Sequence, residues 1–197
     1  MAATSHRAAN VTVRPGNQRG VTNIGWLHSR HSFSFGRYFD PSNVGYRALR
    51  VINDDVVAPG GGFGEHGHDN MEILTWVLDG ALRHGDSLGH MQRLTPGEPQ
   101  VMTAGAGIRH SEMNDSRQEP VHFLQVWIEP ATTDAKPRYE QRAFDASGRA
   151  NRWQTLATGR AGDEAGGVAI DQDAAVRVAD LAAGAELTLT VEPGRHA

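Results

Sequence analysis

Glu65-His66-Gly67-His68 follows the glycine-rich segment Pro59-Gly60-Gly61-Gly62-Phe63-Gly64 and is the most informative stretch of the 197-residue chain. On a β-strand, residues i and i+2 point to the same face, so these two histidines can present their imidazoles to a single ion. His110-Ser111-Glu112 repeats the spacing with an imidazole and a carboxylate. If the two segments form adjacent strands, the sequence predicts one metal site with four ligands: His66, His68, His110 and Glu112.

The ligand types restrict the ion without selecting one. Three nitrogens and one oxygen suit Fe(II), Mn(II), Co(II), Ni(II), Cu(II) or Zn(II), whereas Ca²⁺ and Mg²⁺ prefer shells made of oxygen. The chain has no cysteine, which excludes thiolate zinc sites and iron–sulfur clusters. An octahedral ion would keep two positions open for substrate or dioxygen. Taken alone, however, a His-x-His pair is at least as common on an ordinary solvated strand face as in a metal site.

The pattern of glycines and short apolar runs predicts an all-β fold. Glycine accounts for 23 of the 197 residues and separates runs that are too short for long helices. The spacing of these runs is typical of a sandwich or barrel. Asp79-Gly80 predicts a tight hairpin, and Asn53-Asp54-Asp55 predicts a turn. The expected strands are 48–53, 71–78, 81–86, 91–94, 100–103, 122–128, 168–170, 175–180 and 186–191.

The bulk composition is that of an ordinary globular protein. Hydrophobic residues make up 39% and charged residues 21%, with a net charge of -4. The absence of a basic stripe argues against nucleic acid or anionic lipid as a partner. The first residues lack the apolar core of a signal peptide, and no stretch approaches the roughly 18 apolar residues of a membrane span. We therefore expect a cytoplasmic protein that binds no membrane.

The glycines and candidate ligands also follow a known spacing. The spacing from Gly60 through His66 and His68 to Glu72 is that of a cupin motif, which places metal ligands inside a small jelly-roll barrel. A more specific set of segments is HSFSFG (31–36), YFDP (38–41), LRVINDD (49–55), HGH (66–68) and MTAGAGIRHSE (102–112). Together these segments resemble the pirin family of the cupin superfamily, strongly over residues 10–130 and more weakly beyond them.

The resemblance implies a bicupin in which residues 1–130 form the metal-binding N-terminal cupin domain and residues 131–197 form a linker and a partial C-terminal cupin domain. Pirins continue past the equivalent of Arg195-His196 with further strands, so we expect an incomplete second barrel. The resemblance also implies that the predicted ligands hold iron, with Fe(II) as the expected ion. Glu72 occupies the position of a carboxylate ligand in the general cupin motif, but the resemblance to pirins implies that it is not a ligand here. We expect it beside the ligands or in the substrate cavity.

In function, the resemblance implies a dioxygenase that opens quercetin-like flavonols. The metal would bind the enol through a deprotonated oxygen, Glu112 would take or share that proton, and dioxygen would attack the activated ring. The alternative is a non-catalytic, iron-binding redox sensor that docks a transcription or metabolic protein partner. The two interpretations differ in whether the bound metal turns over a small aromatic substrate.

The other histidines and a group of aromatic residues receive simpler interpretations. His84 and His90 flank a predicted turn and are expected to be solvated. His122 opens a strand, where we expect an ordinary structural role, with a place in the lining of the cavity as the alternative. The aromatic residues that precede the barrel are expected to pack in the core. They are Phe33, Phe35, Tyr38 and Phe39.

Overall fold

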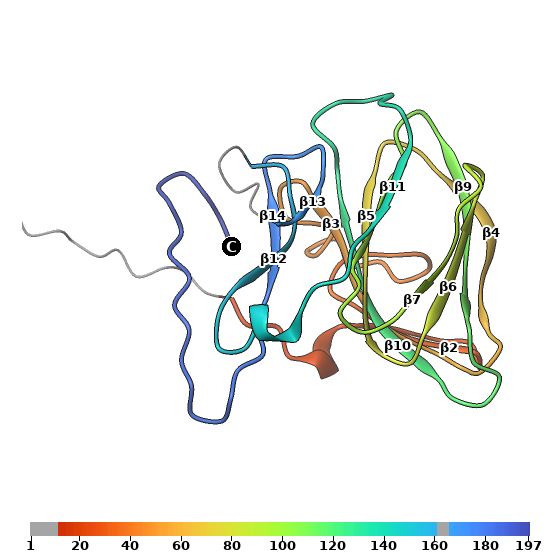
Figure 1. Cartoon of the computed structure of the whole chain (residues 1–197), viewed down its shortest axis with the longest axis horizontal. Coiled ribbons are helices and arrows are strands. Elements are labelled where there is room, and N and C mark those ends of the chain that lie inside the picture. The colour runs from red at the N-terminus through yellow and green to blue at the C-terminus, as the bar shows by residue number, and fades with distance from the viewer. Residues whose placement is uncertain (1–11, 161–165) are drawn as a thin grey trace, which may run out of the picture.

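The structure is a computed structural model that describes residues 12–160 and 166–197, and its regular elements are nearly all β-strands (Figure 1). The described helices are the short 3-10 turns η1 (Gly16–Gln18) and η2 (Ala146–Gly148). Within these residues, no helix is long and apolar enough to cross a membrane. The predicted all-β class is confirmed. Residues 1–11, on which the signal-peptide argument partly rests, lie outside the described residues.

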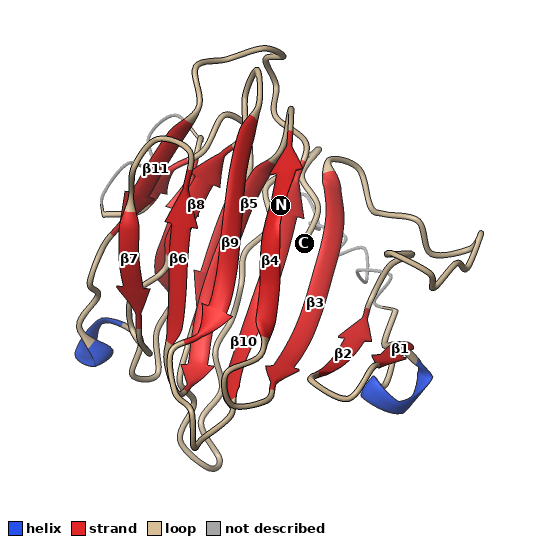
Figure 2. Cartoon of the chain, turned by 90° about the vertical axis from the view of Figure 1, so that its right-hand side faces the viewer, coloured by secondary structure: helices blue, strands red, loops and turns tan. Residues whose placement is uncertain are grey.

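The strands form three sheets, and two of them face each other across a common interior (Figure 2). The large sheet is antiparallel, with β1 (Gly20–Asn23), β2 (Leu27–His31), β3 (Leu49–Val57), β10 (Val121–Ile128), β5 (Glu72–Asp79), β8 (Gln100–Thr103) and β11 (Arg138–Gln141) in that order. The small sheet has β4 (Gly62–His68), β9 (Ile108–Asn114), β6 (Leu82–Asp86) and β7 (Met91–Leu94) in order. The C-terminal sheet has β13 (Val168–Ala169), β12 (Gln154–Thr158) and β14 (Ala175–Val178).

The large sheet is the middle layer of the molecule (Figure 1). Its inner face packs against the small sheet in a jelly-roll arrangement, and its outer face packs against the C-terminal sheet. Side chains on β10 therefore alternate between the two packing faces, which confirms that this strand is apolar on both sides. The outer contact joins Leu74, Trp76 and Val101 of the large sheet to Leu156 and Val168 of the C-terminal sheet.

A band of polar side chains crosses the interior between two apolar clusters. One cluster contains Phe123 and Val77, and the other contains Ile73 with Trp127 packed against it. Between them, β10 contributes the buried side chain of Gln125. On its inward face β10 thus carries apolar, polar and apolar residues in turn, as β5 does with Thr75 between Ile73 and Val77, because inward positions recur every second residue. This polar band is where a hydrophilic site can form inside the barrel.

The predicted hairpin at Asp79-Gly80 is wrong, although a turn does form there. Gly80 has a φ of +78°, which glycine adopts without strain. The turn leads from β5 in the large sheet to β6 in the small sheet, so the two strands do not pair. Both edges of β5 are already hydrogen-bonded to β10 and β8, which are distant in sequence. The Asp-Gly pair thus predicts the turn correctly, but long-range pairing determines the strand partners.

Two further predictions about strands are wrong. Residues 53–55 belong to β3 rather than to a turn, and the side chains of Asn53 and Asp55 are buried in the interior. Residues 186–191 form no strand in the described part of the chain, where the C-terminal sheet contains β13, β12 and β14. A sequence that favours β structure becomes a strand only where it pairs with another strand.

Candidate metal centre

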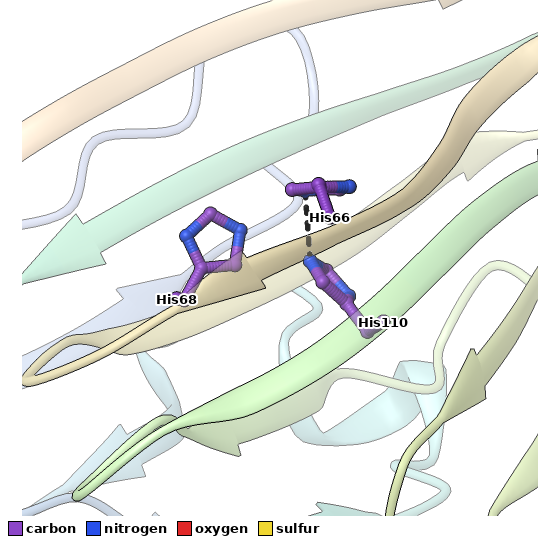
Figure 3. Close-up of side chains that lie close together, drawn as sticks. All are labelled: His66, His68 and His110. Carbon is purple, nitrogen blue, oxygen red and sulfur yellow. Dashed lines mark hydrogen bonds between the residues drawn. The ribbon is translucent and has the colours of Figure 1, made fainter.

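Three histidines from β4 and β9 converge on one point in the polar band (Figure 3). The two strands pair antiparallel with His66 opposite His110, and a bulge between Phe63 and His66 adjusts the register. The strands approach closely because Gly62 has no side chain: a Cβ there would lie 2.6 Å from the Cα of Met113. The predicted pairing of the two ligand segments on adjacent strands is therefore present in the structure.

The geometry of the histidine cluster fits a single ion. The candidate ligand atoms of His66, His68 and His110 all lie within 4.8 Å of one another. The Nε2 atoms of His66 and His110 are 3.1 Å apart. Two nitrogens bound in neighbouring positions at about 2.1 Å from one ion lie about 3 Å apart. The donor set thus needs little rearrangement to hold a divalent transition metal.

The protonation states of these rings also favour metal binding. Burial, reinforced by the neighbouring His66, lowers the pKa of His68 to about 4. Burial, with His66 and His68 nearby, lowers the pKa of His110 to about 3. Both rings are therefore neutral near pH 7 and keep a lone pair for a metal. His66 Nδ1 donates to the carbonyl oxygen of Gly64 at 2.8 Å, which leaves its Nε2 free to act as a ligand.

Glu112 follows His110 on the inward face of β9, but its carboxylate is held by the large sheet. Thr75 Oγ1 donates to Glu112 Oε1 at 3.1 Å, and Gln125 Nε2 donates to Glu112 Oε2. Trp127 Nε1 in turn donates to Gln125 Oε1 at 3.2 Å. Burial raises the pKa of Glu112, opposed by the nearby His84 and by these hydrogen bonds. Among the described residues, the compact ligand cluster contains the three histidines and not this carboxylate.

Glu72 does not line the cavity, contrary to expectation. It alternates with Ile73 along β5 and shares the outer face of the large sheet with Leu74. Its Oε2 accepts a hydrogen bond from Thr103 Oγ1 at 2.7 Å, and Arg138 lies nearby. The motif spacing predicted that Glu72 lies beside the ligands in space. It is close to them in sequence, but strand alternation places its side chain on the outer face of the large sheet, away from them.

Two other expectations are wrong. His84 is fully buried rather than solvated, and its ring centroid lies 5.4 Å from that of His110. Phe39 is 74% exposed instead of packing in the core. His122 is hydrogen-bonded to Asp54 at 2.6 Å on the outer side of the large sheet, so it has the ordinary structural role that was favoured for it and does not line the cavity. Sequence spacing alone does not indicate which face these side chains occupy.

A shallow hollow in the surface borders the histidine cluster at His68. It has a volume of about 490 Å³ and is lined partly by His68, Ala106 and Ile108. Next to it, the ring of Trp127 lies edge-on to His68 at 4.8 Å, and Phe35 packs against Trp127 at 5.3 Å. His68 thus lines this hollow and also contacts an aromatic pair, Trp127 and Phe35, through Trp127.

The fold and this cluster define an all-β protein of the cupin class with a candidate histidine metal centre. The sequence model of the pirin family matches residues 12–128, and the chain belongs to that family. It is 54% identical over 136 residues to the quercetin 2,3-dioxygenase of Escherichia coli K12, covering 69% of this chain and 59% of that protein. It is 42% identical over 182 residues to a pirin-like protein of Caulobacter vibrioides, covering 92% and 78%.

A solved structure supports the same assignment. The crystal structure of the Escherichia coli pirin YhhW in complex with nickel(II) has a TM-score of 0.77 to this chain and 47% sequence identity. The match covers 83% of this chain and 69% of that one. The sequence-based resemblance to pirins is therefore confirmed. The chain spans 59% of the length of the E. coli dioxygenase that it matches.

Proposed function

We propose that the chain binds one divalent transition metal ion, with Fe(II) as the physiological ion, and oxidises a flavonol-like substrate with dioxygen. The proposed ligands are His66, His68, His110 and Glu112. The observation that carries the proposal is the convergence of three imidazoles whose ligand atoms lie within 4.8 Å of one another, one of which, His68, also lines an accessible hollow. A donor set of nitrogen and carboxylate oxygen suits redox-active and Lewis-acidic ions of the first transition row.

When bound, such an ion supplies Lewis-acid activation and a template for substrate and dioxygen. The protein supplies the proton acceptor. Glu112 is buried, and burial raises the pKa of its carboxyl, which favours uptake of a proton from a substrate hydroxyl. Thr75 and Gln125 hold the two carboxylate oxygens and so set the direction in which Glu112 faces.

The surroundings of His68 suit a flat aromatic substrate. Trp127 and Phe35 offer aromatic surfaces next to His68, where a flavonol ring can pack edge to face or stack. The pirin relative named as a quercetin 2,3-dioxygenase makes quercetin the first substrate to test. Binding of such a substrate requires no basic patch, which is consistent with the net charge of -4.

The test is aerobic loss of quercetin absorbance by protein reconstituted with Fe(II). We expect turnover by the wild-type chain and by His122→Ala, a histidine on the outer side of the large sheet. We expect none from His66→Ala, which removes one of the clustered imidazoles. Bound iron without turnover would overturn the dioxygenase assignment and favour the redox-sensing regulator. Failure to bind any of the candidate ions would overturn the metal site itself.

A further inference from the structure

The outer ring nitrogens of two proposed ligands have different surroundings. An imidazole that binds a metal through Nε2 carries its proton on Nδ1, and this N–H is normally hydrogen-bonded to a carboxylate, a carbonyl or water. His66 Nδ1 meets this need with the carbonyl oxygen of Gly64. His110 Nδ1 is buried and has no hydrogen-bond partner among the described residues. For His110 to be held as firmly as His66, its Nδ1–H would need a hydrogen-bond acceptor.

A candidate acceptor is His84 on the adjacent strand. β6 pairs with β9 so that Asp86 lies opposite His110. His84 lies two residues before Asp86 on β6 and therefore faces the same interior. The His84 ring is fully buried, with its centroid 5.4 Å from that of His110. Its Nδ1 is also buried and unpartnered within the described part of the chain. Two unpartnered nitrogens on neighbouring buried rings are suited to bridging by one water molecule.

Asp86 determines which nitrogen of His84 carries the proton. Its buried carboxylate accepts from His84 Nε2 at 2.9 Å and from the backbone N–H of Leu88 at 2.9 Å. The Asp86 carboxylate already accepts hydrogen bonds from backbone N–H groups, so it also acts as the acceptor toward His84. This places a proton on His84 Nε2, which in the neutral ring leaves a lone pair on Nδ1.

An aromatic stack holds this pair in place. Tyr139, on β11 at the edge of the large sheet, stacks on His84 at 4.7 Å and on His90 at 4.8 Å. His90 Nδ1 also donates to Asp86 Oδ2 at 2.9 Å. The orientation of the His84 ring is therefore fixed from one face by Tyr139 and at its edge by Asp86. A fixed acceptor is what a metal ligand needs in order to keep one orientation.

We propose that His84 and Asp86 are positioning residues for the metal ligand His110. In this arrangement His110 Nδ1–H donates to a water that donates to His84 Nδ1, while His84 Nε2–H donates to Asp86. Each donor in the series meets an acceptor. The series orients His110 and makes its Nε2 a stronger electron donor, so it strengthens metal binding. This inference rests on the proposed metal site.

The first experiment compares metal affinity by competition with a chromophoric chelator, using Co(II) and Zn(II). His84→Phe keeps an aromatic ring against Tyr139 but removes both nitrogens, and we expect about a 10- to 100-fold weaker affinity. Asp86→Asn keeps the shape and a weaker acceptor, so we expect a smaller loss and a shift of the Co(II) absorption bands. His122→Phe is the matched control, since His122 also pairs with an aspartate but lies outside the site.

The second experiment reads the proposed protons directly. In ¹⁵N NMR of the Zn(II)-loaded wild-type protein at pH 7, we expect His84 Nε2 and His110 Nδ1 to be protonated and His84 Nδ1 to be unprotonated. A proton on His84 Nδ1, or wild-type affinity in both His84→Phe and Asp86→Asn, would overturn the inference and leave the metal site standing. A wild-type chain that binds no metal would overturn both.

Discussion

The two faces of the large sheet are built from the same strands for different purposes. On the outer face, Leu74 and Trp76 pack against Leu156 of the C-terminal sheet in an apolar cluster. On the inner face, Thr75 and Gln125 are buried among polar groups and hold Glu112 beside the histidines. Burial is nearly complete on both sides. One face therefore stabilises the fold by removing apolar surface from water, while the other buries polar groups to build a site.

This comparison predicts that the two faces can be damaged separately. Truncating an apolar side chain on the outer face should lower stability and leave the metal site intact. Removing a polar group from the inner face should weaken the site with a smaller effect on folding, because inner side chains contribute function as well as packing. Substitutions on the two faces can therefore be paired, with each serving as the control for the other.

The largest effect is expected from His68→Ala. This change removes one of the three clustered imidazoles. We expect metal affinity to fall by more than about 100-fold, which exceeds the loss expected when a hydrogen-bond partner of a metal ligand is removed. Metal content after dialysis and chelator competition measure the loss. The thermal midpoint of the metal-free protein should change little, because His68 is only partly buried. Retention of one metal ion per chain would show that the cluster is not the binding site.

Leu156→Ala should have the opposite profile. Leu156 is fully buried between the large and C-terminal sheets, and truncating a buried leucine to alanine typically costs about 2–5 kcal/mol. We expect urea denaturation to show this loss and chelator competition on the folded protein to show wild-type metal affinity. A stable variant would indicate that the C-terminal sheet contributes little to folding. Weakened metal binding by folded protein would show that the two faces are coupled.

The aspartates of β3 provide a test that depends on pH. Asp55 faces the interior, and burial raises its pKa to about 7, aided by the nearby Glu112. From about pH 4 to pH 7 the folded protein therefore holds a proton that the unfolded chain has lost, so Asp55 lowers stability as the pH rises through this range. Asp55→Asn should remove this loss and gain stability relative to wild type by at most about 1.4 kcal/mol per pH unit.

Urea denaturation of the metal-free protein between pH 4 and pH 7 measures this difference. Asp54→Asn is the control, because Asp54 lies on the outer side of the same strand, where it pairs with the partly exposed His122. We expect the stability difference from wild type to change less steeply with pH for Asp54→Asn than for Asp55→Asn. The same pH dependence of this difference in both variants would mean that the interior does not alter the titration of Asp55.

Local spacing was enough to predict the parts of the site that lie on one strand. The i, i+2 pattern of β4 and β9 identified His66, His68 and His110 because strand alternation fixes which side chains share a face. The same reasoning placed Glu112 on the inward face, and the resemblance to pirins supplied the family. The strand limits 91–94 and 100–103 were also predicted as the structure has them.

Long-range pairing accounts for what the sequence could not show. His84 and Asp86 lie among glycines and a serine that predict a surface turn, yet Tyr139, far along the chain, covers them. Glu72 is close to the ligands in sequence, but it faces the C-terminal sheet. These positions depend on which sheet each strand joins, and that choice is made by contacts between segments far apart.

The smallest effect is expected from Thr75→Val, which keeps the side-chain shape and removes the hydroxyl that donates to Glu112. Thr158→Val makes the same change in β12, where the hydroxyl donates to the carbonyl oxygen of Ala174 at 3.4 Å. Each variant should lose about 0.5–3 kcal/mol of stability, with the larger loss for the bond to a carboxylate. Only Thr75→Val should also weaken metal binding, by a few-fold, because it frees one oxygen of Glu112. Equal metal affinity in the two variants would mean that Thr75 does not orient the carboxylate, and the polar inner face would then act on Glu112 through Gln125 alone.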